Sequence, residues 1–228
     1  MRAFYDLHIH SCLSPCGDRD MTPKNIAGMA ALCGLEVIAV ADHNTCGHCP
    51  QVAQAAREQG LLAVPAMELT TSEETHILCF LPDLDAAREF SDYVYSKLPD
   101  IPNREDIFGE QLVLDGDDNP AGVEQRFLLS ATSISVYDVA ALMREYGGAA
   151  VPAHIDRTSF SVLSNLGLWD FGWGFRTYEV YARDRVFPEL AGLRRISNSD
   201  AHALESMRDA ENALDLDRLS ARAVIDML

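Results

Sequence analysis

The stretch LEVIAVADHNT, residues 35–45, places a nearly unbroken apolar run directly before Asp42, His43 and Asn44. Strands that are buried on both faces, as in a parallel sheet covered by helices, read as runs of this kind. Ligands and catalytic groups of parallel α/β folds gather where such strands end. The stretch therefore predicts a buried strand that delivers polar side chains to a site at its carboxyl end.

Similar apolar runs lie on both sides of this stretch, and helical patterns separate them. The expected strands are residues 3–9, 35–42, 61–69, 75–81, 149–155, 177–182 and 194–200. The expected helices are residues 22–34, 49–60, 83–98, 136–148, 161–167, 188–193 and 217–228. Strands that alternate with helices in this way predict an α/β fold, either a parallel sheet or a barrel, in one domain covering residues 1–228.

This alternation breaks between about residues 99 and 133. A turn signal, DGDDNPAG at residues 115–122, lies there between two short apolar runs. Such a pattern predicts a hairpin insertion rather than a linker to a second domain. Because the insertion falls between the strands that carry His76 and His154, we expect it near the mouth of the site.

The composition limits the partners of the chain. The 228 residues carry a formal net charge of -17. Non-specific binding to nucleic acid or to an anionic membrane depends on basic residues, so we expect neither duplex nucleic acid nor a membrane as a partner. No apolar run approaches the roughly 18 residues that span a bilayer, and the N-terminus lacks a signal pattern, so we expect a cytoplasmic protein. The oligomeric state stays open.

Histidines and carboxylates lie where the expected strands end. Asp6, His8 and His10 alternate along the first strand, so they share one face of it. The further members are His43, Glu68, His76, His154, Asp200 and His202. Each has a structural explanation when taken alone, such as a hydrogen-bonded core histidine, but only His48 of the seven histidines lies elsewhere. Imidazoles and carboxylates in this number suit two or three ions of zinc, iron or manganese.

The cysteines offer a second possible site. The pairs Cys12 with Cys16 and Cys46 with Cys49 have spacings that fit free thiols in loops, a redox pair, or together a four-cysteine zinc site. The sequence leaves these three roles open.

Six features occur in an order that closely resembles the motifs of the PHP (polymerase and histidinol phosphatase) superfamily of metal-dependent phosphoesterases. They are DLHIHS at 6–11, ADHNT at 41–45, Glu68, His76, PAHIDR at 152–157 and SDAH at 199–202. The resemblance spans residues 5 to about 203. It implies a distorted (β/α)7 barrel of PHP type, with residues 99–133 as an insertion and with a metal centre at the carboxyl ends of the strands.

The resemblance also implies how the ligands divide among the ions. His8, His10 and Asp200 bind the first ion, Glu68 bridges it to the second, His76 and His154 complete the second, and His43 and His202 bind the third. The loop SPCGDRDMTP, residues 14–23, lacks the S-D-G sequence of many members. Alignment on Thr22 and Pro23 assigns Asp18 to the third ion, with Asp20 as the alternative. We expect Asp6 to orient a ligating imidazole.

We therefore expect a metal-dependent phosphoesterase that hydrolyses a small phosphate ester, such as a nucleotide or a phosphorylated metabolite, with a metal-bridging hydroxide. The alternatives are a non-catalytic, metal-binding regulatory PHP domain and a nuclease that acts on oligonucleotide ends. Arg157 is the first candidate to grip the phosphate, because its fork suits two oxygens and it follows His154 closely. Arg183 and Asn44 are further candidates. A surface ion pair between Arg157 and Asp156 is the structural alternative.

Overall fold

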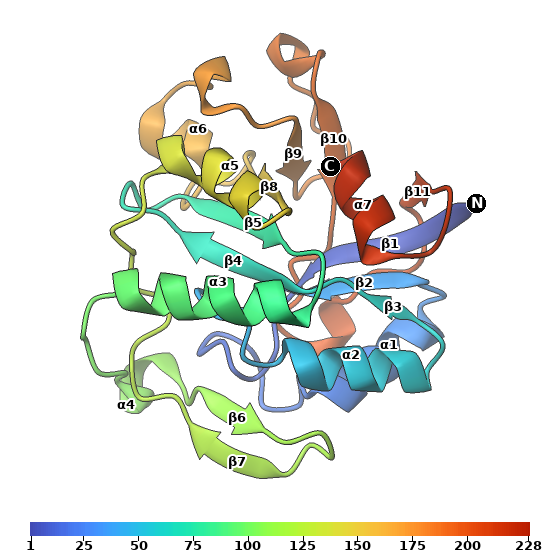
Figure 1. Cartoon of the computed structure of the whole chain (residues 1–228), viewed down its shortest axis with the longest axis vertical. Helices are drawn as coiled ribbons and strands as arrows, with labels where there is room; N and C mark the ends of the chain where they lie inside the picture. The colour runs from blue at the N-terminus through green and yellow to red at the C-terminus, as the bar shows by residue number, and fades with distance from the viewer.

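The computed structural model describes all 228 residues, and strands and helices follow one another in mixed order along the chain (Figure 1). The strands are β1 (Arg2–Ile9), β2 (Val37–Val40), β3 (Leu62–Ala63), β4 (Ala66–Thr70), β5 (His76–Phe80), β6 (Leu112–Leu114), β7 (Pro120–Val123), β8 (Ala149–Pro152), β9 (Thr177–Val180), β10 (Arg194–Ser197) and β11 (Ala213–Asp215). The helices are α1 (Pro23–Leu32), α2 (Cys49–Glu58), α3 (Leu84–Lys97), α4 (Glu105–Phe108), α5 (Val136–Glu145), α6 (Val162–Leu166) and α7 (Ala221–Met227), with three short 3-10 helices at Phe171–Trp173, Pro188–Leu190 and Leu204–Ser206.

The strand directions differ from an all-parallel arrangement at two places. β1, β2 and β3 pair in parallel, as do β9 and β10. However, β5 runs antiparallel to both of its neighbours, β4 and β8, and β11 pairs antiparallel with β1. The segment 71–75 that joins β4 to β5 is too short for a crossover, and antiparallel pairing is what a short connection permits. The expectation of a parallel sheet was wrong for β5, and β11 was not expected.

Other element boundaries have local causes. The expected strand 61–69 divides into β3 and β4 around Pro65, which has no N–H to donate to a sheet. The expected helix 188–193 is only a 3-10 turn. Helix α1 begins as predicted, since Thr22 accepts a hydrogen bond from the Asn25 N–H and Pro23 occupies the first turn.

The strands form four sheets: β11-β1-β2-β3, β4-β5-β8, β9-β10 and β6-β7. Isolated bridges join two pairs of these sheets, His43 with Glu68 and Ile9 with Ala201. The Ile155 N–H also donates to the carbonyl of Glu179, which links the segment after β8 to β9. The mixed α/β architecture is therefore confirmed, whereas closure of the strands into a barrel stays a prediction.

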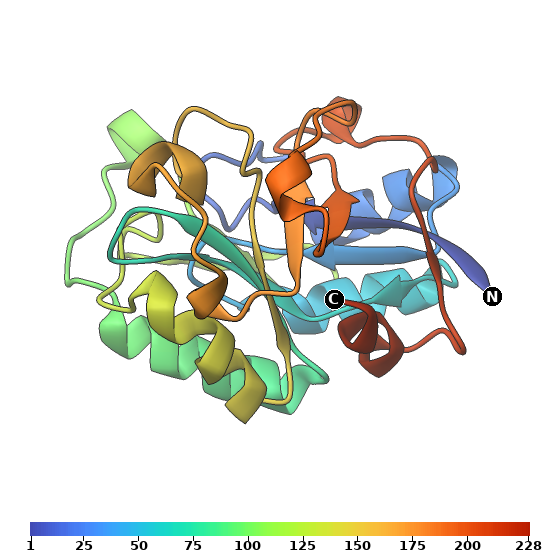
Figure 2. The ribbon, with the colours of Figure 1, turned by 90° about the horizontal axis from the view of Figure 1, so that it is seen from above.

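The packed interior lies between these strands and the helices outside them (Figure 2). One apolar cluster draws buried side chains from seven strands and from α7; among them are Leu7, Ala39, Leu78, Val151 and Ile196. A second cluster packs β4 and β5 against α3 and α5, and a third packs β1 and β2 against α1 and α2. None of the helices combines the length and the apolar character that a membrane span requires.

The insertion contains the predicted hairpin, formed by β6 and β7 as an antiparallel pair. It is anchored by buried groups that lie beside the expected ligands. The Leu114 N–H donates to Nε2 of His48 at 3.0 Å, and the amide of Asn44 donates to the carbonyls of Leu128 and Ser130. The hairpin itself lies at the lower edge of Figure 1. The segment that returns from it reaches Asn44, beside His43, through the carbonyls of Leu128 and Ser130.

Candidate metal centre

Seven of the eight expected ligands in the strand-end set are buried, and His202 is half-buried. His8 and Glu68 lie within strands, and His10, His43, His154, Asp200 and His202 follow strands directly or within a few residues. His76 instead opens β5, and because β5 runs antiparallel to its neighbours, its first residue meets the ends of the others. His154 and Asp200 have positive φ values of 28° and 51°. Such backbone strain in non-glycine residues is characteristic of functional sites.

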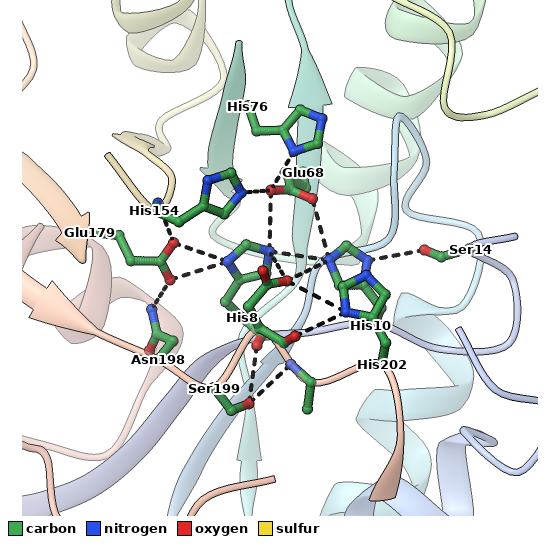
Figure 3. A network of polar contacts seen from close by, with 12 residues as sticks. His8, His10, Ser14, Glu68, His76, His154, Glu179, Asn198, Ser199 and His202 are labelled. Atoms are coloured by element: carbon green, nitrogen blue, oxygen red, sulfur yellow. Dashed lines mark hydrogen bonds and ion pairs between the residues drawn. The ribbon is translucent and has the colours of Figure 1, made fainter. Parts of the chain in front are cut away.

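The carboxylate of Glu68 lies at the middle of the site (Figure 3). Its two oxygens contact five imidazoles: Oε1 lies 3.3 Å from His8 Nε2, 3.0 Å from His76 Nδ1 and 3.1 Å from His154 Nε2, while Oε2 lies 3.3 Å from His10 Nε2 and 3.1 Å from His43 Nδ1. A carboxylate whose two oxygens face different sets of imidazoles has the arrangement of a ligand that bridges ions.

Three groups of side chains bring their ligand atoms within 4.8 Å of one another. They are His8, His10 and Asp200; His43, Glu68 and His76; and His10, His43 and His202. The first group matches the set expected for one ion, and Asp200 Oδ1 lies 3.3 Å from Nε2 of both His8 and His10. The other groups place His43 beside Glu68 as well as beside His202. His154 approaches Glu68 but belongs to none of the three groups.

Hydrogen bonds on the far side of the imidazoles set which nitrogen faces the centre. Nδ1 of His8 lies 3.1 Å from both oxygens of Glu179. Nδ1 of His10 lies 3.1 Å from Ser14 Oγ, which donates in turn to Asp42 Oδ1 at 2.7 Å. Each Nδ1 is therefore assigned as the protonated nitrogen, which leaves the two Nε2 lone pairs facing each other at 3.2 Å. Two lone pairs at this distance repel unless a proton or a cation lies between them.

Glu179 is the functional residue that the sequence did not reveal. It is buried in β9 and also accepts hydrogen bonds from the His154 N–H at 2.8 Å and from Asn198 Nδ2 at 2.6 Å. An acidic residue within a fully buried strand was the only available signal. The orienting role had been expected of Asp6, and that expectation was wrong. Asp6 lies deeper along β1, where Oδ1 accepts the backbone N–H groups of His8 and Ser199 rather than an imidazole.

The buried carboxylate of Glu68 keeps its charge. Burial opposes ionisation of Glu68, but His76, His8 and His43 hold its pKa well below the usual range. Burial also opposes charge on the imidazoles, yet Glu179, Asp200 and Glu68 raise the pKa of His8 well above its ordinary value. Against burial, hydrogen bonds to Asp200 and Glu68 raise the pKa of His10 to about 9. The centre therefore requires positive charge, which protons supply here and which divalent cations would supply more fully.

The loop after β1 does not bring its carboxylates to the centre. Asp18 and Asp20 are exposed, and neither belongs to the three groups of ligand atoms. Asp18 approaches only through its backbone, whose N–H donates to the carbonyl of His202 at 2.8 Å. Cys16, in the same loop, lines the cavity over the centre. All six cysteines are free thiols and none belongs to a metal-type group, so the structure does not assemble a four-cysteine site.

The three candidates for phosphate recognition have different surroundings. Arg157 lines the cavity over the centre, where its Nη2 lies 2.8 Å from Asp200 Oδ2 and its guanidinium stacks on Tyr181. Asp156 instead accepts the backbone N–H groups of Tyr181 and Ala182, so the alternative of an Asp156–Arg157 ion pair is not seen. Arg183 pairs with Glu211 and lines a different, much smaller cavity.

Asn44 is buried and its amide is fully used by the protein backbone. Its Nδ2 donates to the carbonyls of Leu128 and Ser130, and its Oδ1 accepts the Thr70 N–H at 2.9 Å. The amide thus fixes the insertion beside the centre and has no free donor for a substrate. This geometry contradicts the expectation that Asn44 contacts the phosphate.

The cavity over the centre has a volume of about 240 Å³. Six of the expected ligands line it, namely His43, Glu68, His76, His154, Asp200 and His202. The remaining lining residues are Cys16, Leu129, Arg157, Ser159 and Phe160. Phe160 stacks on the His76 ring with a centroid distance of 4.6 Å. Leu129 belongs to the insertion, and its place in the cavity lining supports the expected position of the insertion near the mouth of the site.

Searches by sequence gave no matching family model and no matching curated protein. Solved structures do match. The lesion-specific endonuclease Q of Pyrococcus furiosus is 18% identical with a TM-score of 0.73, over 99% of this chain and 55% of that one. A further endonuclease Q structure, with the same TM-score, holds a 27-mer duplex with an abasic lesion at its active site. This chain spans little more than half the length of these endonucleases.

Other matches are to phosphoesterase-type proteins. A candidate metal-dependent phosphoesterase from Bifidobacterium adolescentis is 20% identical with a TM-score of 0.59, over 95% of this chain and 92% of that one. A two-domain protein from Bacteroides vulgatus, which contains a predicted PHP-like metal-dependent phosphoesterase, is 16% identical with a TM-score of 0.53, over 90% of this chain and 53% of that one. The resemblance read from the motifs is thus confirmed at the level of structure: the neighbours of this chain are PHP-like metal-dependent phosphoesterases and an endonuclease, and it has their fold.

Proposed function

We propose that this chain is a metal-dependent phosphoesterase that hydrolyses small phosphate esters at a centre of two or three divalent ions, with zinc, manganese or iron as the candidates. The observation that carries the proposal is the environment of Glu68, whose carboxylate contacts five imidazole nitrogens at 3.0–3.3 Å. A purely structural ion pair needs one partner. Five imidazole rings around one buried carboxylate suit cations placed among them.

The proposed ligands are those that the structure gathers: His8, His10, His43, Glu68, His76, His154, Asp200 and His202. Asp18 is retained only as a candidate that requires its side chain to turn inward. When bound, the ions activate a water for attack and neutralise the phosphoryl oxygens. The protein orients the imidazoles before binding, because Glu179 and Ser14 hold His8 and His10 with their Nε2 atoms inward. Arg157 would then grip a phosphate oxygen from the rim.

We also propose that residues 1–228 form one domain whose seven central strands close into a distorted barrel. The order would be β1, β2, the β3–β4 segment, β5, β8, β9, β10 and back to β1. The separate sheets leave three neighbouring pairs in this order without a ladder of hydrogen bonds. Each pair has one contact that supports it: the bridge His43–Glu68, the hydrogen bond from the Ile155 N–H to the Glu179 carbonyl, and the bridge Ile9–Ala201. The apolar cluster shared by six of these strands, β1, β2, β4, β5, β8 and β10, supports a common interior.

The size of the cavity favours a small ester over a polymer. A volume of about 240 Å³ suits a compact group, and the chain has 18 basic residues against 35 acidic ones. The similarity to endonuclease Q makes action on a nucleic-acid end the second candidate. A non-catalytic regulatory domain is the third, and the complete set of imidazoles at the centre argues against it because such a role does not require them all.

The test is hydrolysis by protein that has been stripped with a chelator and reloaded with zinc, manganese or iron(II). The substrates are p-nitrophenyl phosphate, a panel of phosphorylated metabolites and a single-stranded oligonucleotide bearing a terminal phosphate. We expect metal-dependent release from small esters. Glu68→Gln should abolish it and lower the content of two ions at once, whereas Glu89→Gln, an exposed change on α3, should not. Cleavage of the oligonucleotide alone would favour the nuclease, and no hydrolysis despite full metal content would favour the regulatory domain.

A further inference from the structure

A second, larger cavity lies at the end of the strands opposite the metal centre. Its volume is about 350 Å³. The first residues of three strands line it, namely Ala149 of β8, Thr177 of β9 and Arg194 of β10. The same strands carry or lead to His154, Glu179 and Asp200 of the metal centre. Five residues separate Ala149 from His154 and six separate Arg194 from Asp200, which at about 3.3 Å per residue is at most roughly 17–20 Å of extended chain.

Four arginines line this cavity: Arg144 from the end of α5, Arg176 just before β9, Arg194 at the start of β10 and Arg222 in α7. Figure 1 shows the last helix and the chain end beside β9 and β10, which is where these segments meet. The cavity contains one acidic side chain, Asp226, and it pairs with Arg222 at 2.7 Å. Arg144, Arg176 and Arg194 have no carboxylate within ion-pair distance, although the chain has 35 acidic residues.

Ordinary structural roles explain only part of this cluster. Arg144 lies in the last turn of α5, where a positive charge favours the helix dipole. Arg222 donates to the carbonyl of Gly147 at 3.1 Å and pairs with Asp226. No such contact involves the guanidinium groups of Arg176 and Arg194. The four arginines meet two carboxylates in this cavity, those of Asp226 and of Leu228, so positive charge remains in excess. The repulsion among the guanidinium groups is relieved when an anion lies between them.

We propose that this cavity binds a small polyanion that carries phosphate groups, at a site separate from the metal centre. Guanidinium forks bind phosphate oxygens in pairs, and several forks around one cavity select a compact ligand with more than one charge. A volume near 350 Å³ is at the lower end of the range for small-molecule sites, so it admits a metabolite rather than a polymer. Gly174 also lines this cavity, with a φ of +81°. A Cβ at this position would lie 3.6 Å from Nη1 of Arg144.

The experiment is calorimetric titration of the full chain with inorganic pyrophosphate at fixed ionic strength, after a chelator has removed metal. We expect one site, and Arg176→Gln and Arg194→Gln should each weaken the affinity by about tenfold or more, as loss of a charged hydrogen bond predicts. Arg88→Gln is the matched control, since Arg88 is an exposed arginine on α3 that pairs with Asp85. It should leave the affinity within about twofold.

A fourth variant separates the two cavities. Arg157→Gln should leave the binding of pyrophosphate to the metal-free protein unchanged if the arginine cavity holds it. Binding that falls in Arg157→Gln but persists in Arg176→Gln and Arg194→Gln would place the anion at the metal centre and overturn the proposal. Absence of binding, or equal weakening by Arg88→Gln, would overturn it as well. Thermal unfolding of each variant without ligand confirms that the exposed substitutions leave the fold intact.

Discussion

Replacing Glu179 by glutamine tests whether the affinity for metal depends on the orientation of the imidazoles as well as on their presence. Glu179 accepts from Nδ1 of His8, from the His154 N–H and from Asn198 Nδ2 at 2.6–3.1 Å. Glutamine has nearly the same shape but no charge and only one acceptor oxygen. Either the His154 N–H or Asn198 Nδ2 therefore faces an amide N–H in place of an oxygen. His8, whose Nδ1 lies 3.1 Å from both oxygens, keeps a single neutral acceptor in place of a carboxylate, so its Nε2 lone pair is held inward less firmly.

The expected loss follows from this geometry. Partners that orient metal-ligating histidines are worth about 10- to 100-fold in metal affinity, which is about 1.4–2.7 kcal/mol. Against burial, Glu179 is also the largest charge that raises the pKa of His8. Without it a proton competes less with the metal, so part of the loss is offset near neutral pH. The deficit of Glu179→Gln should therefore grow as pH rises, because the proton on His8 of the unsubstituted protein then competes less with the metal.

The measurement is competition for zinc or manganese between the protein and a chromophoric chelator, at several pH values, with Glu89→Gln as the control. Urea unfolding of the metal-free variant separates lost stability from lost affinity. Wild-type affinity in Glu179→Gln at every pH would refute the orienting role. A deficit that shrinks as pH rises would contradict the expected competition between the proton and the metal at His8.

Three further outcomes are expected. Arg157→Ala should keep the full metal content but lose about 10- to 1000-fold in kcat/KM toward its ester, and unchanged turnover would remove Arg157 from phosphate recognition. Asn44→Ala should lower the free energy of unfolding by about 2–3 kcal/mol, because three buried backbone groups lose their partner; a change below about 0.5 kcal/mol in urea unfolding would contradict this. The pKa of His10 is raised from 6.5 to about 9, so stability that is fully present below pH 6.5 should decline in the metal-free protein as pH rises through about 9, by up to about 3 kcal/mol. Urea unfolding across that range checks it, and bound metal should abolish the decline; a metal-free protein that gains stability instead would contradict the assignment.

The positions of the proposed ligands could be predicted because they break a pattern. A histidine or a carboxylate directly after an apolar run has no place in a packed sheet, so its position at the strand end carries information. His10, His43 and Asp200 are found in this way, and the structure gathers all three with their neighbours. The exclusion of His48 also agrees with the structure, where it is buried between Ser11 and the Leu114 N–H and its pKa is lowered by burial.

The antiparallel direction of β5 could have been predicted from the sequence. Only residues 71–75 separate the runs that become β4 and β5, and a parallel crossover needs a dozen residues or more. Glu179 could not be assigned a partner from the sequence, because His8 is 171 positions away and nothing local indicates that the two meet. The division of ligands among ions is equally non-local, since His43 approaches both Glu68 and His202 only through the arrangement of the strands.

The insertion bears on which ester the centre can accept. Its returning segment is held by buried hydrogen bonds from Asn44, which adjoins His43, and this contact places Leu129 in the wall of the cavity. Phe160, stacked on His76, forms another part of the wall. A duplex needs phosphate contacts along its length, and a chain of charge -17 offers few of them beyond the rim arginine, Arg157. We therefore expect a nucleic acid to present an end to these walls, as we propose for a small ester, and substitutions at Leu129 should change the preference among esters while the metal content stays constant.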